Sequence, residues 1–278
     1  MKIFKTCILA TLVGLGGCGG DTQTVKTTTE PTPEQPAELP APPPFNPTDA
    51  ENIALVPSPV ETEKALVAAG IDTRLSSLIP DRTLDMDVAD LDQAALRSGV
   101  VLADMLLTVK TAEKEELLAY LSKIRVGMKQ LRGGKDIDAT LRDMTERIRA
   151  DSVSRGELLK EFDELSGAVI PELEFNGNDR VVPLIEAGSW VEGANLVSRA
   201  VKEKGDSTSA DQLLKQPAVV DYFSRYVKKE GDRAPEAITK QLVESLDALH
   251  GLAKKTDPLT MEDIDTVILV TDNVLKLL

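Results

Sequence analysis

Cysteine, histidine and aromatic residues are scarce in this chain of 278 residues. The two cysteines, Cys7 and Cys18, both lie near the N-terminus, so the rest of the chain must be stable without disulfides. The single histidine, His250, excludes metal sites and catalytic triads that need several imidazoles, and we expect it at the surface near a helix end. Aromatic residues make up 3%, with Trp190 the only tryptophan, whereas sites for sugars or flat cofactors usually contain more rings. We therefore expect neither a metal nor another cofactor.

Positive charge is also in short supply, because 32 Lys and Arg residues face 46 Asp and Glu residues, which gives a net charge of −14. An acidic surface repels both nucleic-acid phosphates and anionic lipid head groups. We therefore expect no nucleic-acid partner. We also expect membrane contact to come from an acyl anchor and not from a basic patch.

Two segments resemble ligand-binding loops but lack the residues that the chemistry needs. Gly133-Gly134-Lys135 would be part of a phosphate-binding loop only with glycine at Lys129 and a hydroxyl at Asp136. A run of acids lacks the ligand spacing of a calcium-binding loop, and acids in a first helical turn complement the helix dipole. The acids of this run are Asp81, Asp85, Asp87, Asp90 and Asp92.

The N-terminus has the three parts of a secretory signal. Lys2 and Lys5 supply positive charge, residues 8–15 are apolar, and small residues precede Cys18. An apolar core this short does not span a bilayer, since a spanning helix needs about 20 residues. Leu15-Gly16-Gly17-Cys18 resembles the lipobox of bacterial lipoproteins. That resemblance implies removal of residues 1–17 and acylation of Cys18, with chains such as palmitate holding the protein to a membrane. The alternative is an ordinary signal peptide with a chance cysteine.

Residues 18–50 are rich first in threonine and then in proline, without apolar periodicity. Such a composition favours an extended, flexible tether, with a proline-rich recognition motif as the alternative. Gly19 follows the cysteine, whereas an aspartate there resembles an inner-membrane retention signal in lipoproteins of two-membrane bacteria. The resemblance therefore implies the outer membrane, with the domain facing the periplasm.

Residues 51–278 show helical periodicity nearly throughout, which predicts an all-α bundle or array of about eight to ten helices. Ser154 with Glu157 and Thr260 with Asp263 are typical of capping boxes at helix starts. Pro171 and Pro217 are expected to end or kink helices. Residues 267–270 are β-branched enough to be compatible with a short strand.

Two details concern single positions within the helices. Asp104 stands within the apolar run 100–107, and because it shares a polar stripe with Gln93, Arg97 and Thr108 we expect it to be solvated. Leu96-Arg-Ser-Gly99 aligns with Ile185-Glu-Ala-Gly188, which suggests two related halves.

The segment 184–194 is the one place where the sequence suggests a binding site. Two glycines within six residues weaken a helix by about 1 kcal/mol each, which indicates close packing or a site. The segment loosely resembles uncharacterised, mainly helical bacterial envelope proteins, a resemblance that implies a helical fold and no activity. The candidate binding residues are Glu186, Trp190, Glu192, Asn195 and Arg199. The competing interpretation is a close-packed helix whose Trp190 fills the core.

These observations favour a lipid-anchored interaction or structural module of the cell envelope that binds another envelope protein. The first alternative is a carrier of a small ligand or lipid, with a pocket between helices near Trp190. The second is a hydrolase that uses two carboxylates, although no catalytic constellation is evident and we expect no enzyme. A carrier should contain an apolar cavity of several hundred Å³, an adaptor an exposed apolar patch, and an enzyme two facing acids in a cleft.

Overall fold

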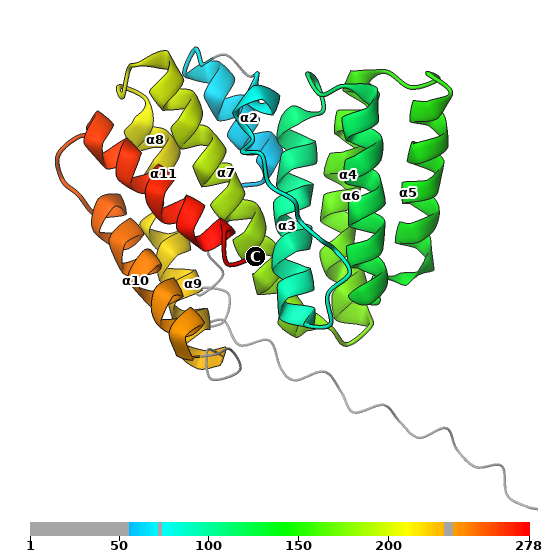
Figure 1. Cartoon of the computed structure of the whole chain (residues 1–278). Coiled ribbons are helices and arrows are strands. Elements are labelled where there is room, and N and C mark those ends of the chain that lie inside the picture. Colours follow the sequence, from blue (N-terminus) through cyan, green and yellow to red (C-terminus); the bar gives the residue numbers. More distant parts are fainter. Residues whose placement is uncertain (1–55, 72–73, 231–235) are drawn as a thin grey trace, which may run out of the picture. The chain divides into compact units, whose positions relative to one another are not determined.

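The computed structural model describes residues 56–71, 74–230 and 236–278, and every regular element within these ranges is a helix (Figure 1). The all-α fold expected from the apolar spacing is thereby confirmed. The signal segment 1–17, Cys18 and the tether to residue 50 lie outside the described residues. Among the described residues, no helix combines the length and the apolar composition needed to cross a bilayer.

The helices follow one another with short connections. In chain order they are α2 (Pro59–Ala68), the 3₁₀ turn η1 (Leu75–Leu78), α3 (Leu91–Thr108), α4 (Lys114–Gln130), α5 (Gly134–Arg149), α6 (Arg155–Phe175), the 3₁₀ turn η2 (Asp179–Val181), α7 (Val182–Lys204), α8 (Ala210–Leu214), α9 (Pro217–Glu230), α10 (Glu236–Ala253) and α11 (Met261–Leu275).

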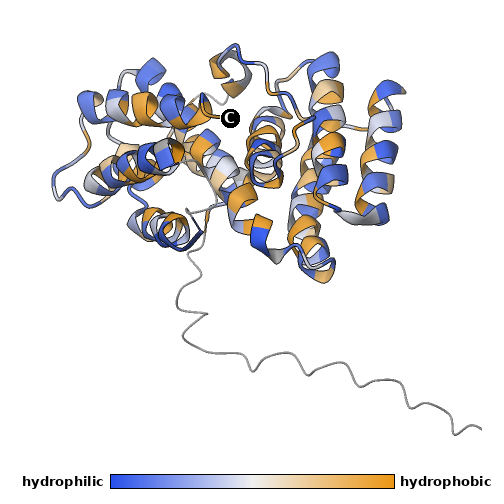
Figure 2. Ribbon diagram, turned by 60° about the horizontal axis from the view of Figure 1, so that its bottom comes forward, coloured by the Kyte–Doolittle hydropathy of each residue, from blue (hydrophilic) through white to orange (hydrophobic). Residues whose placement is uncertain are grey.

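Helices α3 and α7 pack along each other at the centre of this arrangement (Figure 1). Helix α4 packs on α3, and α5 packs on α4. Helix α6 packs on α5 and also contacts α3 and α7, while α11, α8 and α9 pack on α7. Most of α3 is buried, because it contacts neighbours on nearly every side. The outer helices, in contrast, carry alternating hydrophobic and hydrophilic faces (Figure 2). A functional side chain on α7 is therefore positioned by the helix pair that has the most extensive contact in the fold.

Local sequence signals explain where several helices begin. Ser154 accepts a hydrogen bond from the backbone N–H of Glu157, and Thr260 accepts one from Asp263, so both predicted capping boxes are confirmed. Pro217 is the first residue of α9, where a missing N–H costs nothing. These signals act within one turn and do not depend on tertiary packing.

Two local expectations are corrected by the structure: Pro171 does not end its helix, and the short strand allowed at residues 267–270 is absent. Helix α6 continues through Pro171 to Phe175, because Val169 and Leu173 are buried on either side of the proline and hold the last turn against the core. The β-branched residues 267–270 form part of α11 and not a strand. Val267 is buried against the core, and this packing overrides the weak strand propensity of the segment.

Candidate functional site

The five candidate binding residues all lie on α7, but they point toward different neighbours. Glu186 and Trp190 face α9, Glu192 faces α3, and Asn195 and Arg199 face α11. The structure therefore brings them to one helix without gathering them around one ligand. Each must be considered with the residues that it contacts.

Glu192 belongs to a buried cluster with Arg82 and Asp104. Arg82 Nη2 lies 2.7 Å from Glu192 Oε2 and 3.1 Å from both carboxylate oxygens of Asp104. Glu192 has no exposed surface, and Asp104 is 4% exposed. The expectation that Asp104 is solvated is thus wrong. The polar stripe suggested contact with water, but Asp104 instead contacts Arg82, which lies in the segment between η1 and α3.

The cluster holds two carboxylates and one guanidinium, which makes it short of positive charge. Burial raises the pKa of Asp104 well above its ordinary value, the charge of Glu192 raises it further, and Arg82 opposes both effects. When Asp104 holds a proton, one carboxylate faces one guanidinium and the cluster is neutral overall. Burial, with the charge of Asp104 as the next cause, also raises the pKa of Tyr120 on α4.

The two acids meet only part of the requirement for a hydrolase. They face each other, but neither is open to a glycan or another bulky substrate while Arg82 covers them. Nε and Nη1 of Arg82 and Oε1 of Glu192 are buried without a hydrogen-bond partner among the described residues. Such atoms cost about 1–3 kcal/mol each, which offsets part of the stability that the ion pairs of the cluster contribute.

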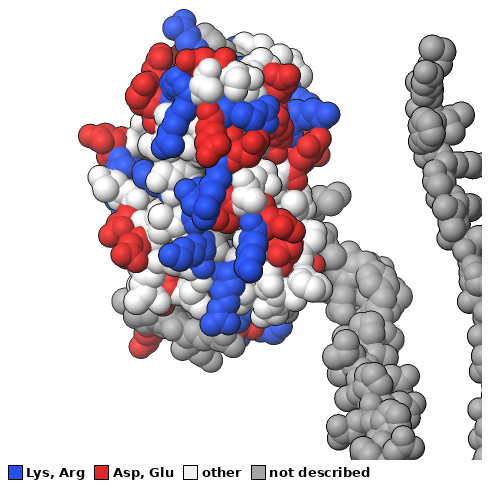
Figure 3. Space-filling model, turned by 90° about the vertical axis from the view of Figure 1, so that its right-hand side faces the viewer, with Lys and Arg blue, Asp and Glu red and all other residues white. Residues whose placement is uncertain are grey.

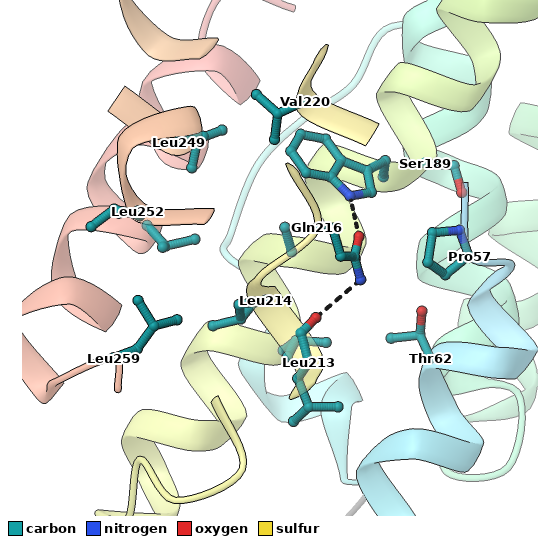
Figure 4. Close-up of a pocket in the computed structure, with 15 residues that line it drawn as sticks. Pro57, Thr62, Ser189, Leu213, Leu214, Gln216, Val220, Leu249, Leu252 and Leu259 are labelled. Carbon is teal, nitrogen blue, oxygen red and sulfur yellow. Dashed lines mark hydrogen bonds between the residues drawn. The ribbon is translucent and has the colours of Figure 1, made fainter. Parts of the chain in front are cut away.

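Trp190 packs as a core residue with one polar contact. The side chain is 8% exposed, and its ring centre lies 5.5 Å from that of Phe223. Its Nε1 donates a hydrogen bond of 2.7 Å to Gln216 Oε1, marked by a dashed line in Figure 4. Gln216 Nε2 in turn donates to the carbonyl of Leu213 at 3.1 Å. The indole therefore ties α7 to the connection between α8 and α9.

The pocket beside Trp190 is mainly apolar but small. It lies among α7, α8, α10 and α11, with Leu213, Leu249 and Leu259 in its wall (Figure 4). Its volume is about 40 Å³, room for a few water molecules at most. The several hundred Å³ that a lipid carrier requires are not present at this place in the described structure.

Glu186 is a half-buried acid at the α7–α9 contact. Tyr222 Oη donates a hydrogen bond of 3.2 Å to Glu186 Oε2. Burial raises the pKa of Glu186, and the hydrogen bond from Tyr222 partly opposes that rise. This side chain links two helices and is not free to bind a ligand on its own.

Asn195 and Arg199 hold α7 to α11 through Thr271 and Asp272. Asn195 Nδ2 donates to Thr271 Oγ1 at 2.9 Å and to Asp272 Oδ1 at 2.8 Å. Arg199 Nη2 binds both oxygens of Asp272 at 2.7 and 2.9 Å, and Arg199 Nε donates to Asn195 Oδ1 at 2.8 Å. All of these polar groups are matched within the protein, which is the arrangement expected of a helix–helix bridge.

The sequence reasoning missed Arg82, Asp104, Gln216 and Asp272, the partners of the α7 residues. Asp104 had a usable signal, because its helical neighbours Val100, Val101 and Leu107 are apolar, and an acid among apolar side chains needs a cation. Arg82 had none, since it lies in an irregular segment whose path depends on tertiary packing.

Metal-binding chemistry has no obvious place in the described ranges, where no three His, Cys, Asp or Glu residues form a cluster. His250 lies near the end of α10, with its Nε2 2.8 Å from Asp221 Oδ1 and its side chain 31% exposed. Comparison of the chain with protein-family models, curated proteins and solved structures finds no match.

Proposed function

We propose that this protein is a lipid-anchored interaction module of the cell envelope, attached through acyl chains on Cys18 and facing the periplasm from the outer membrane. The anchor is supported by Leu15-Gly16-Gly17-Cys18 directly after an apolar run. A module of this kind works by presenting a rigid surface to another envelope protein.

One observation carries the choice of a module over a carrier or an enzyme. The polar side chains of α7, the helix in which the candidate site lies, bond to neighbouring helices and fix their positions. Polar groups used in this way give stiffness to the helical domain and leave recognition to its surface. Beside Trp190, where the carrier alternative places its pocket, the described residues enclose about 40 Å³, and the two acids that would serve a hydrolase are covered.

The surface formed by the described residues does not present one large apolar patch of the kind expected for an adaptor. The large apolar side chains exposed on the described surface lie one to a helix, on α2, α3, α4, α6 and α11; they are Val67, Leu91, Val126, Phe175 and Leu269. Recognition through this surface would therefore depend largely on polar and charged groups.

The anchor is tested by replacing each cysteine in the full chain. Cys18→Ala should abolish labelling with a fatty-acid probe and release the protein from the membrane fraction or leave it unprocessed. Cys7→Ala is the matched control, because that residue would leave with the signal, and it should label normally. Labelling of the Cys18→Ala variant would contradict the anchor.

The interaction role is tested by photo-crosslinking in intact envelopes. Reactive groups at exposed positions on α4, α5 and α6 should capture the same envelope protein, identified by mass spectrometry. Reactive groups at buried positions such as Leu196 should capture nothing. Uniform capture of many unrelated proteins would contradict a specific module.

A further inference from the structure

Helices α4 and α5 form a groove whose lining is strongly basic although the protein is acidic. A hollow of about 340 Å³ lies at the turn between the two helices, with Met128 and Leu141 as its apolar part. A second hollow of about 390 Å³ shares Arg125 and Arg142 with the first and continues toward the end of α5. The cations along the groove are Arg125, Lys129, Arg132, Lys135, Arg142 and Arg149, and the acids are Asp138 and Glu146.

Most of this positive charge is not neutralised within the protein. Asp138 binds Arg125 at 3.0 Å and Arg142 at 2.6 Å and so offsets part of their charge. In the part of the chain that the structure describes, Lys129, Arg132, Lys135 and Arg149 form no ion pair. The groove therefore holds uncompensated cations on a chain of net charge −14. Net charge averages over the whole surface, so an acidic chain can still carry a local basic groove.

The arrangement of charges favours a narrow occupant. Lys and Arg run down the middle of this face, with Asp and Glu on both sides (Figure 3). A flat anionic membrane would meet those flanking acids as well as the cations, and like charges repel within the screening length of about 8 Å at physiological salt. A single extended anionic chain in the groove would meet the cations first. Duplex nucleic acid is too wide for this, and single-stranded nucleic acid usually stacks on aromatic rings, which the groove lining lacks.

We propose that the α4–α5 groove binds an extended acidic segment of the protein partner. This inference rests on the proposed function and names the surface and the chemistry of that interaction. Arginine pairs with carboxylates in a two-pronged geometry, and an extended chain places every second side chain on the same side. Carboxylates would meet the cations while intervening apolar side chains contact Met128 and Leu141. The 16 residues of α5 extend for about 24 Å, which an extended segment of about seven residues matches.

The experiment uses the full, acylated chain in detergent and a fluorescent heptapeptide of alternating glutamate and leucine. Binding is followed by anisotropy as the salt concentration rises, with a peptide of glutamine and leucine as the ligand control. The groove variant is Arg132→Glu with Lys135→Glu. The matched control is Lys160→Glu with Lys240→Glu, which changes the net charge equally at exposed positions outside the groove.

The acidic peptide should bind, and its affinity should fall as salt rises, because the contacts are between exposed charges. The groove variant should weaken binding by roughly tenfold or more and the control by less than about threefold. Equal weakening by both variants, or equal binding of the glutamine peptide, would overturn the proposal. So would groove-dependent binding of vesicles containing anionic lipid without binding of the peptide.

Crosslinking of the groove variant tests the groove assignment independently of the proposed function. If the variant still captures the same envelope partner with unchanged yield, the groove assignment is wrong and the module stands. If the wild-type chain captures no specific partner but binds the peptide through the groove, the module is wrong and the groove's preference for acidic segments stands.

Discussion

Gly99 of α3 and Gly188 of α7 are related by reciprocal contacts. A Cβ on Gly99 would overlap the carbonyl oxygen of Ile185, and a Cβ on Gly188 would overlap the carbonyl oxygen of Leu96. Gly99 thus lies against Ile185, three positions before Gly188, and Gly188 lies against Leu96, three positions before Gly99. The two aligned tetrapeptides, 96–99 and 185–188, meet face to face at the centre of the fold. Their similarity reflects a shared packing requirement, because only residues without a Cβ let the backbones approach this closely.

The first prediction follows from this contact. Gly99→Ala and Gly188→Ala should each lower the free energy of unfolding by about 1–3 kcal/mol or more, because the added methyl group meets backbone atoms that cannot turn aside. Gly193→Ala is the matched control on α7, since a Cβ there has no neighbour within 4 Å. It should stabilise the helix by up to about 1 kcal/mol. Urea denaturation followed by circular dichroism measures all three.

Gly193 also corrects an expectation. Both glycines of the α7 segment were expected to lie at a close helix approach, but only Gly188 does. If Gly193→Ala destabilised the protein as much as Gly188→Ala, the close crossing at residue 188 would not be the reason for the effect.

The helices could be predicted from the sequence because each depends on signals within one or two turns. Apolar residues such as Leu117, Leu121 and Ile124 recur at helical spacing, and Ser154 or Thr260 mark helix starts. The neighbour that each α7 side chain contacts could not be predicted. It depends on which helix packs on which face, and for Arg82 on the path of an irregular segment. The cationic groove was missed for the same reason, because α4 and α5 supply its charges jointly.

The second prediction concerns the buried acids. The folded-state pKa of Asp104 is raised above the ordinary 3.8, mainly by burial. The protonated acid therefore contributes stability that is complete below about pH 4 and is lost as pH rises through the raised folded-state value. Asp104→Asn should remove this loss. Glu192→Gln should reduce it, because it removes the second cause of the raised pKa and leaves burial in place. Denaturation midpoints measured across the acid-to-neutral range test this.

Arg82→Met is the contrasting variant in this cluster. It should destabilise the protein by about 3–5 kcal/mol at neutral pH, since two buried carboxylates lose their only cation. Replacing all three residues by apolar ones of similar size should restore most of that loss. A wild-type stability that rises steadily toward neutral pH, unchanged by Asp104→Asn, would contradict the raised pKa.

The third prediction concerns the start of α11, where the pKa of an acid is lowered. The pH dependence of stability there is opposite to that expected for Asp104. A hydrogen bond from Lys255 is the main cause that lowers the pKa of Asp263 to about 2, and the backbone N–H of Thr260 is the next. The ionised group contributes stability that is present above the ordinary value of 3.8 and is lost as pH falls through about 2. Asp263→Asn should therefore lower stability at neutral pH and flatten the acid side of the profile. Glu262→Gln, in the same turn, is the control, and an equal effect from it would argue against the cap.

The last prediction concerns Trp190, where packing and binding interpretations differ most. Trp190→Ala should lower the free energy of unfolding by about 3–5 kcal/mol, because a ring that is 8% exposed leaves a cavity next to Phe223. Gln216→Leu should cost about 1–3 kcal/mol, since the indole N–H then lacks its acceptor. Phe175→Ala is the control, because that ring is 87% exposed and its loss should change stability by less than about 0.5 kcal/mol. As the only tryptophan, Trp190 also reports its own burial, and its fluorescence should resist quenching by acrylamide. Ready quenching in the folded protein, with a small cost of Trp190→Ala, would show that the ring is open to a ligand and that the pocket beside it is larger in solution.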